Sequence, residues 1–313
     1  MTESPLIIVV GPTGAGKSAL ALHIAAQFGG EVVNCDSLQV YRYFDIGTAK
    51  LPAVERRGIP HHLIDVLDPD QGFTGGEYSR RARPLLAEIT ARSRVPVVAG
   101  GTGFYLKALI EGLFPGPERD DAVRQRLSAR EAARPGSLAR VLRRLDPEAA
   151  RRIHANDLPK LIRALEVRLL AHRPVSEMFR QGRDALAGYR PLTIGLDPPR
   201  DQLCPALDRR AQAMFEGGLV EEVSAILARG FDPACKPFES HGYKQALQLL
   251  RGELSPQQAL FYAQRNTRRY SKRQMTWFRQ QPGIEWFRGF GGQEEIQAVV
   301  AARVQDYLAQ FQS

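Results

Sequence analysis

Hydrophobic and polar positions along the first hundred residues follow two alternating patterns. Apolar runs at residues 6–10 and 95–99, and a shorter one within residues 31–35, have the length and composition of buried parallel strands. Residues 18–28 and 77–92 instead repeat apolar side chains at helical spacing. Strands that alternate with helices predict an α/β fold with a parallel sheet, whose functional loops lie at the carboxyl ends of the strands.

The pattern changes after the sequence FPGP at residues 114–117. The next stretch is rich in Arg and Ala and has helical spacing, so we expect helices at residues 122–134, 137–145 and 158–172. A strand signal returns at residues 192–196, and helices are expected after it at residues 200–216, 220–229, 242–251 and 256–279. The sequence therefore predicts a core formed by residues 1–116 and 191–313, with a helical insertion at residues 117–190 and helices near the C-terminus.

Composition limits the class of protein. The 313 residues are enough for a sizeable core, and no apolar run approaches the ~20 residues that a membrane helix requires. The run at residues 6–10 is too short for a signal peptide, so we expect a cytoplasmic protein with no membrane partner. The cysteines Cys35, Cys204 and Cys235 are too widely spaced for a disulfide framework or a metal motif.

The net charge of +9 is concentrated in two segments. Residues 118–190 hold 17 basic and 10 acidic side chains, and residues 265–280 hold six basic and no acidic ones. Two local excesses of this kind indicate a surface for a polyanion, and nucleic acid is the first candidate.

One segment carries a specific phosphate-binding motif. The residues Gly11, Pro12, Thr13, Gly14, Ala15, Gly16, Lys17 and Ser18 match G-x-x-x-x-G-K-[ST] in full, between a predicted strand and a predicted helix. In such a P-loop the backbone amides point at phosphate oxygens, the lysine adds a charge and the serine can bind Mg²⁺. The motif predicts a P-loop NTPase-like core that binds a diphosphate or triphosphate group and uses Mg²⁺ as cofactor.

A carboxylate that usually accompanies this motif in nucleotide hydrolysis is missing. The strand at residues 95–99 ends in Gly-Gly-Thr-Gly and not in Asp, and Asp65 follows only a short apolar stretch. The loop is therefore also compatible with a diphosphate that leaves as a product without nucleotide hydrolysis.

Two further loops begin at carboxyl ends of predicted strands. Asp36 follows the second strand and could bind Mg²⁺ or accept a proton, although Asp at such a position is also typical of a helix N-cap. Thr102 lies among glycines after the strand at residues 95–99, where close approach to a ligand and a tight turn are equally good interpretations. His61 and His62 lack partners at metal-ligand spacing, so we expect structural roles for them.

An ordered set of segments now carries a resemblance. They are GPTGAGKS, DSLQVYRYFDIGTAK, HHLIDVLDP, VPVVAGGTGFYLKAL, RRIHANDLPKLIRALEV, GGLVEEV, HGYKQAL and YSKRQMTWFR. Taken together and in this order, they resemble the tRNA dimethylallyltransferase family over nearly the whole chain. The C-terminal segment lacks the Cys and His residues of the zinc finger found in eukaryotic members, so the resemblance is to the bacterial form.

The resemblance implies transfer of a dimethylallyl group from dimethylallyl diphosphate to the exocyclic N6 amine of the adenosine 3′ of the anticodon in tRNA. The P-loop would hold the diphosphate together with Mg²⁺, for which Ser18 and Asp36 are the expected ligands. The resemblance implies that Asp36 is the general base and that Thr102 holds the base or the donor in line. It also implies a diphosphate contact from an arginine, which spacing places at Arg210, with Arg209 as the neighbouring alternative.

The resemblance implies that the insertion and the last long helix contact tRNA, and we expect a monomer. The RNA contacts are expected at Asp36, Ser37, Leu38, Gln39, Thr102, Arg124, Lys160, Leu161, Ile162, Arg163, His241, Gly242, Tyr243, Lys244, Lys272, Arg273, Gln274, Trp277 and Arg279. Packing of Trp277 and Phe278 into the core is the alternative for these aromatic residues. The chain departs from the family pattern at Ala206, where Arg is usual, and at Gly75-Gly76.

Three other functions remain open at this point. A P-loop kinase for a small acceptor shares the loop and Asp36, but does not explain the basic insertion. A nucleotide-gated RNA-binding module leaves Asp36 and Thr102 without a task. An adenylate isopentenyltransferase uses the same donor on free AMP, against which the basic segments argue.

Overall fold

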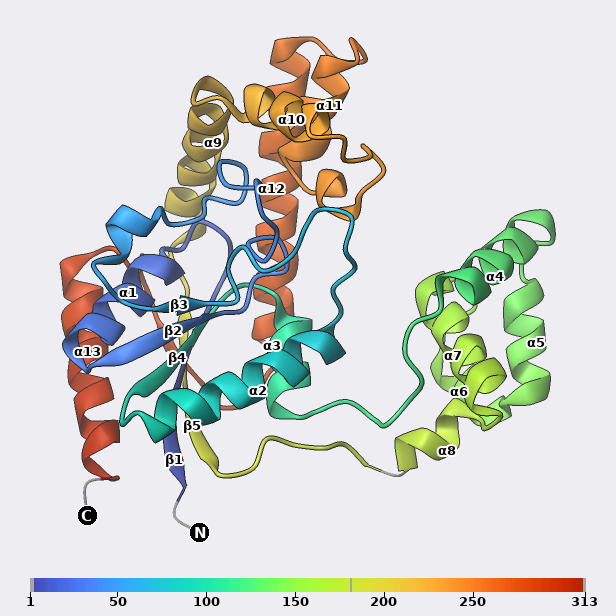
Figure 1. Cartoon of the computed structure of the whole chain (residues 1–313), viewed down its shortest axis with the longest axis horizontal. Helices are drawn as coiled ribbons and strands as arrows, with labels where there is room; N and C mark the ends of the chain where they lie inside the picture. The colour runs from blue at the N-terminus through green and yellow to red at the C-terminus, as the bar shows by residue number, and fades with distance from the viewer. Residues whose placement is uncertain (1–2, 181, 312–313) are drawn as a thin grey trace. The chain divides into compact units, whose positions relative to one another are not determined.

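The computed structural model describes residues 3–180 and 182–311. The chain divides into two compact units (Figure 1): one contains the chain up to Leu109 and from Leu186 onwards, and the other is Ile110–Ala185. The composition change at residues 114–117 falls just inside the second unit. Each unit is described by itself below.

The first unit is built on a parallel sheet of six strands in the order β3-β2-β4-β1-β5-β6. The strands are β1 (Ser4–Val10), β2 (Gly30–Asn34), β3 (His61–His62), β4 (Val95–Ala99), β5 (Tyr189–Leu196) and β6 (Ile284–Phe287). At the central strand, Val9 is in register with Ala99 of β4 and Ile194 of β5. The predicted α/β class is confirmed, and the loops after β1, β2 and β4 meet at one edge of the sheet.

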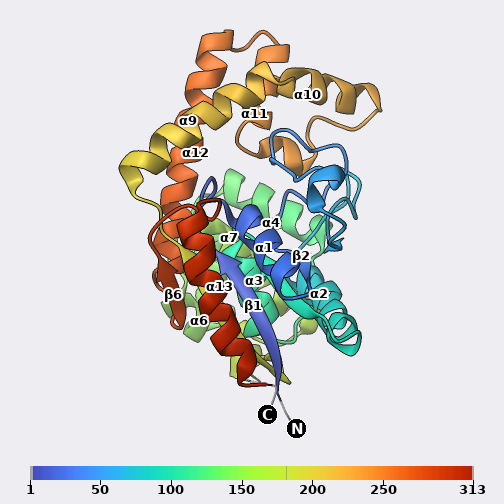
Figure 2. The same ribbon diagram turned by 90° about the vertical axis from the view of Figure 1, so that its left-hand side faces the viewer.

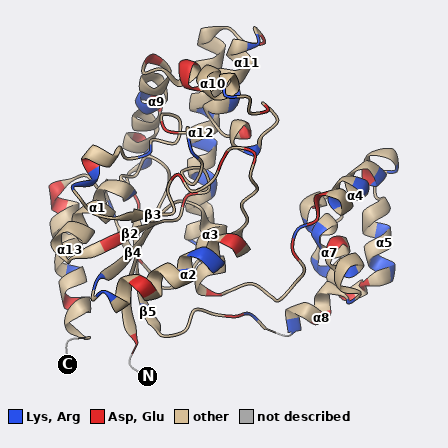
Figure 3. Ribbon diagram, viewed as in Figure 1, with Lys and Arg blue, Asp and Glu red and all other residues tan. Residues whose placement is uncertain are grey.

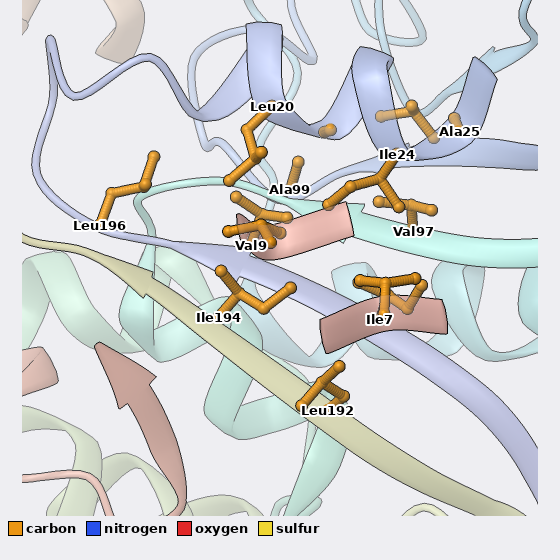
Figure 4. Close-up of a cluster of buried hydrophobic side chains, with 14 of the residues drawn as sticks. Ile7, Val9, Leu20, Ile24, Ala25, Val97, Ala99, Leu192, Ile194 and Leu196 are labelled. Carbon is orange, nitrogen blue, oxygen red and sulfur yellow. The ribbon is translucent and has the colours of Figure 1, made fainter. Parts of the chain in front are cut away.

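Side chains of the central strands pack against the helix that follows the P-loop. Figure 4 shows Ile7 and Val9 of β1 with Val97, Ala99, Ile194 and Leu196, facing Leu20 and Ile24 of α1 (Lys17–Gln27). The C-terminal helix α13 (Glu294–Ala309) lies beside α1 (Figure 2), and the Tyr307 hydroxyl accepts a hydrogen bond from Leu6 N at 3.0 Å. Burial of this apolar surface fixes the position at which β1 ends and the P-loop begins.

Helix α2 (Gly75–Ala91) packs against β2 and β4, and α3 (Gly103–Ile110) follows β4 in the chain. Thr74 and Glu77 form a capping box at the start of α2. The unusual Gly75 has a packing reason: a Cβ there would lie 2.7 Å from the Phe104 ring. The expected helix at residues 77–92 therefore begins two residues earlier, at the glycine pair.

Four helices lie beyond the carboxyl edge of the sheet (Figures 1 and 2). They are α9 (Arg200–Glu216), α10 (Leu219–Ala228), α11 (Tyr243–Leu250) and α12 (Pro256–Phe278). Helix α12 packs against α9 and α11, and α10 packs against α11. All four match the predicted positions to within one residue at each end. The sequence pattern did not predict β3, α3, β6 or α13.

The second unit contains only helices in its described residues: α4 (Asp121–Ala133), α5 (Ser137–Leu145), α6 (Pro147–Arg152), α7 (Leu158–Ala171) and α8 (Val175–Arg180). Its core includes Leu138, Leu142 and Leu165 together with Leu161 and Ile162. Leu161 is 1% and Ile162 is 6% exposed. This corrects the expectation that these two side chains face RNA, because the apolar face of α7 is used to hold the helices together.

A fully buried carboxylate organises the charged side of this unit. Glu166 accepts hydrogen bonds from Arg124 at 3.0 Å, from Arg163 at 2.7 Å and from Asp120 N at 2.9 Å. Arg124 and Arg163, both expected at an RNA surface, therefore share one counter-charge inside the unit.

Candidate active site

The P-loop joins the centre of the sheet to α1. Gly14 and Gly16 have positive φ values of 78° and 84°, which glycine adopts without a Cβ penalty. Lys17 lies at the first turn of α1, and its Nζ donates to the Pro12 carbonyl at 2.8 Å. Ser18 is exposed beside it. The sequence therefore folds here into the loop-and-helix geometry that binds phosphate groups.

Asp36 lies directly after β2, in a turn that its own carboxylate closes. Its Oδ1 accepts the N–H of Leu38 at 2.9 Å, and its N–H donates to Asn34 Oδ1 at 3.1 Å. Residues 37–40, all of which the structure describes, form a turn and not a helix, so the N-cap alternative is wrong for Asp36. These hydrogen bonds fix the orientation of the carboxylate.

Thr102 connects the loop after β4 to the Asp36 loop. Its Oγ1 accepts the N–H of Ser37 at 3.0 Å and donates to Ser37 Oγ at 3.3 Å. Ser37 lines the cavity described next, whereas Thr102 is not among its lining residues. Thr102 therefore contacts Ser37, which lines the cavity, but does not line the cavity itself. Gln39 also turns to the protein, since its Nε2 donates to the Thr48 carbonyl at 3.1 Å.

These loops open into a cavity of about 320 Å³ in the first unit. Thr13, Lys17, Asp36 and Ser37 line its floor, and α9 and α12 supply Arg210 and Arg273. Arg209 is exposed and is not among the lining residues, so the structure selects Arg210 as the arginine beside the P-loop. His241 and Gly242, both expected at the RNA interface, also line the cavity.

Lys17 and Arg210 are the most deeply buried cations of the cavity, which is also lined by Arg273 and by the carboxylates Asp36 and Glu239. Burial lowers the pKa of Lys17 to about 8; the Asp36 charge opposes this shift and the Arg210 charge adds to it. Burial also lowers the pKa of Arg210, against the opposing influence of Asp36. Within the part of the chain that the structure describes, neither cation is within ion-pair distance of a carboxylate. An entering anion would therefore meet two cations whose charge is not already neutralised by contact.

Apolar side chains that the sequence analysis did not name form the other wall. Leu207, Ala211 and Met214 project from α9 at helical spacing, and Phe215 and Leu219 extend the same surface. That spacing was a usable signal, because it places the three α9 residues on one face of the helix, with Arg210 at the edge of that face. Tyr270 also lines the cavity, and burial raises its pKa to about 12, so the phenol keeps its proton at neutral pH.

Gln274 connects α12 to both glycine-containing loops. Its Oε1 accepts the N–H of Thr13 at 2.8 Å, and its Nε2 donates to the Gly101 carbonyl at 2.9 Å. The side chain is buried, with the residue only 6% exposed. This corrects the expectation of a surface contact with RNA, because both polar ends of the amide are already used inside the protein.

The remaining expected RNA residues divide between surface and interior. Lys244, Lys272 and Arg273 are exposed, and Figure 3 shows basic residues along α12. Arg279 is exposed but pairs with Asp197 at 3.0 Å, and Lys160 pairs with Asp157 at 2.6 Å.

The aromatic residues near the end of α12 and at the start of α11 turn inward. Tyr243 is buried, and its hydroxyl bonds to Glu222, which corrects its assignment to RNA contact. Trp277 packs beside Gly103 and against Phe278, with ring centroids 5.1 Å apart, and Phe278 is buried. Packing is therefore established for both α12 aromatics, and Trp277 keeps only a partly exposed surface.

The histidine pair His61 and His62 has a structural role. His62 Nε2 lies 2.7 Å from Glu31 in a contact between β3 and β2, which agrees with the expected structural role. Over residues 3–180 and 182–311, no group of three or more His, Cys, Asp or Glu could hold a metal ion. Over the same residues, no helix has the length and apolar character needed to cross a membrane.

The fold and this site define a P-loop NTPase-like protein, with a parallel sheet and GPTGAGKS between its central strand and α1. A family model described as IPP transferase matches residues 39–281. The chain therefore belongs to the IPP transferase family.

Curated relatives and solved structures agree over nearly the full length. A protein of Solibacter usitatus named tRNA dimethylallyltransferase is 64% identical, covering 98% of this chain and 100% of the relative. One of the same name from Koribacter versatilis is 52% identical, covering 95% and 96%.

Among solved structures, a tRNA isopentenylpyrophosphate transferase from Bacillus halodurans has a TM-score of 0.71 and 35% identity, covering 98% of this chain and 96% of its own. A eukaryotic dimethylallyltransferase acting on tRNA has a TM-score of 0.83 and 28% identity, covering 98% and 80%.

Proposed function

We propose that this protein transfers a dimethylallyl group from dimethylallyl diphosphate to the N6 amine of an adenosine in tRNA, with release of diphosphate. The observation that carries the proposal is the cavity in which Lys17, Arg210 and Asp36 converge beside an apolar wall. Membership of the IPP transferase family and 64% identity to a protein named tRNA dimethylallyltransferase support it. The adenosine 3′ of the anticodon is the proposed target.

The transfer forms a carbon–nitrogen bond, breaks a carbon–oxygen bond and moves one proton from the amine to a base. The N6 nitrogen attacks the allylic carbon, the carbon–oxygen bond to the diphosphate breaks, and the bonding pair leaves with the diphosphate. Lys17, Arg210 and the P-loop amides stabilise the negative charge that develops on the leaving oxygen. Asp36 accepts the proton that the amine loses, and the hydrogen bond from Leu38 N–H holds its carboxylate in place.

The apolar wall suits the rest of the donor. Leu207, Met214 and Phe215 offer a surface against which the branched hydrocarbon group can be buried. The wall therefore favours prenyl transfer over the phosphoryl-transfer alternative.

Magnesium is proposed as the cofactor. The Ser18 hydroxyl at the start of α1 and the Asp36 carboxylate are oxygen donors of the kind that Mg²⁺ prefers, and Mg²⁺ commonly takes one or two protein ligands together with substrate phosphates. When bound, the ion would neutralise part of the diphosphate charge.

The RNA surface is proposed on the exposed cations of α12, with Lys272 and Arg273 as its centre. In the helical unit, Lys160, Arg124 and Arg163 are proposed as further contacts. Together these three cations carry one positive charge more than their partners Asp157 and Glu166 neutralise. An adenosine that reaches the cavity must leave its base stack.

One experiment separates the candidate functions. The protein is incubated with Mg²⁺, isotope-labelled dimethylallyl diphosphate and unmodified tRNA, and parallel reactions replace tRNA by AMP or the donor by labelled ATP. We expect label in tRNA only. Label in AMP would favour an adenylate isopentenyltransferase, and ATP-dependent labelling of a small acceptor would favour a kinase.

A further inference from the structure

The amide of Gln274 holds together the two loops that border the phosphate end of the cavity. Thr13 belongs to the P-loop after β1, and Gly101 belongs to the loop after β4. The Gln274 side chain accepts from one and donates to the other, at 2.8 Å and 2.9 Å. A helix near the other end of the sequence, α12, is thereby attached to both loops.

The surroundings of this amide show that the site is closely fitted. A Cβ at position 101 would lie 2.4 Å from Gln274 Nε2 and 3.5 Å from Lys17 Nζ. A side chain at position 101 would therefore have to displace the Gln274 amide from the Gly101 carbonyl. The bond to Gly101 is buried, so its loss would leave the Gly101 carbonyl unsatisfied, and loss of the second bond would release the half-buried Thr13 amide.

We propose that Gln274 is a positioning residue for the diphosphate: it holds the Thr13 amide and the P-loop in their anion-binding conformation. The Thr13 N–H is directed at Gln274, so Gln274 fixes the peptide that leads into the phosphate-binding turn. Gln274 thereby acts on donor binding through the P-loop and not on RNA binding, although exposed Lys272 and Arg273 immediately precede it. The proposal deepens the proposed function and rests on it for the identity of the donor.

The first test compares two affinities in the full-length protein. Inorganic diphosphate binding is measured by calorimetry with Mg²⁺ and without tRNA, and tRNA binding is measured without diphosphate. We expect Gln274→Ala to weaken diphosphate binding about tenfold or more and to leave tRNA affinity within about twofold of wild type. Weaker tRNA binding with unchanged diphosphate binding, or no change in either, would overturn the proposal.

A matched control lies on the same helix. Gln264 of α12 donates its Nε2 to the Asp208 carbonyl at 3.2 Å and does not line the cavity. Gln264→Ala removes a glutamine side-chain bond between α12 and α9 but should leave diphosphate affinity unchanged. If both alanine variants weaken diphosphate binding equally, the effect comes from general loosening of α12 and the proposal fails.

The variant Gln274→Glu adds a second test, because loss of packing alone would not make diphosphate affinity depend on pH. A neutral carboxylic acid can replace both bonds of the amide, since its C=O can accept from Thr13 N–H and its O–H can donate to the Gly101 carbonyl, whereas a carboxylate brings a second acceptor against that carbonyl. Burial and Asp36 favour the neutral form at this position, and Lys17 and Arg273 favour the ionised form. Tyr270 keeps its proton over this pH range, and Arg210, Glu239 and His241, which also line the cavity, are the same in the variant and in wild type, so comparison at equal pH cancels their effect.

We therefore expect the diphosphate affinity of Gln274→Glu, relative to wild type at the same pH, to rise as pH falls from about 8 to about 5.5. A ratio of variant to wild-type affinity that does not change with pH would contradict the proposal that both hydrogen bonds of Gln274 hold the loops. Failure of wild type to prenylate tRNA would instead contradict the proposed function, and the diphosphate affinities would still decide the role of Gln274.

Discussion

The cations of the cavity and the cations of the helical unit are held in opposite ways. Lys17 and Arg210 are largely buried without a carboxylate at ion-pair distance, and burial lowers the pKa of each. Arg124 and Arg163 both contact the fully buried Glu166. The first pair keeps its charge available for a ligand, whereas much of the charge of the second pair stabilises the protein itself. The number of basic residues in a segment therefore does not measure its capacity to bind an anion.

The largest expected effect comes from changing Asp36, the cavity carboxylate whose charge acts on both Lys17 and Arg210. Asp36→Ala should lower the rate of transfer to tRNA by about 10²- to 10⁴-fold, because it removes the proposed proton acceptor. Affinity for tRNA should stay close to wild type. Single-turnover transfer and a separate tRNA-binding measurement check this, and a variant that still turns over at the wild-type rate would show that Asp36 is not the base.

The two adjacent arginines of α9 provide a matched pair. Arg210→Ala should reduce transfer by about 10²-fold, since it removes a cation next to the leaving group. Arg209→Ala removes the same side chain from an exposed position outside the cavity and should have little effect. Steady-state kinetics with dimethylallyl diphosphate distinguish them, and equal losses would contradict the assignment of Arg210.

A change in Glu166 tests the structural side of the comparison. Glu166→Ala leaves Arg124 and Arg163 without their shared partner and should destabilise the helical unit by about 3 kcal/mol. Hydrogen exchange of the α7 amides measures this effect. Glu148→Ala, which breaks contacts of the exposed Arg152 and Arg180 in the same unit, should cost about 1 kcal/mol or less. Similar costs for the two variants would show that burial of Glu166 has no special role.

The smallest expected effect concerns the RNA surface. Lys272→Ala combined with Arg273→Ala should weaken tRNA binding by about tenfold and reduce the slope of log affinity against log salt by about 1.5. Arg124→Ala should reduce the slope less, because Glu166 already compensates much of that charge. Binding titrations at several salt concentrations test both. An unchanged slope in the double variant would remove α12 from the RNA surface.

Much of the first unit could be predicted because its signals are local. The apolar strands, the P-loop and the four helices beyond the sheet all follow from short-range periodicity and one specific motif. β6 could not be predicted, since four mixed residues, Ile284–Phe287, become a strand only by pairing with β5. The strand His61–His62 likewise exists only through its pairing with β2.

The sequence predicted which loops form the site, but not which side chains contact one another within it. Asp36 and Lys17 were identified from their positions after strands, and the choice between Arg209 and Arg210 required the geometry of α9. Gln274 was assigned to RNA contact as part of the family resemblance, whereas its side chain points into the protein. The sequence did not indicate that Glu166 is buried among ion pairs. Two of its partners, Asp120 and Arg124, lie more than 40 residues away, and the spacing of Arg163 to Glu166 alone is equally typical of an exposed helix face.

The central claim is that Lys17 and Arg210 keep their charge for a diphosphate. Its most direct test is calorimetric titration of inorganic diphosphate, with Mg²⁺, into wild type and into the double variant Lys17→Met with Arg210→Met. We predict binding of one diphosphate per chain by wild type and no measurable binding by the double variant, with tRNA affinity retained in both. Wild-type diphosphate affinity in the double variant would contradict the account.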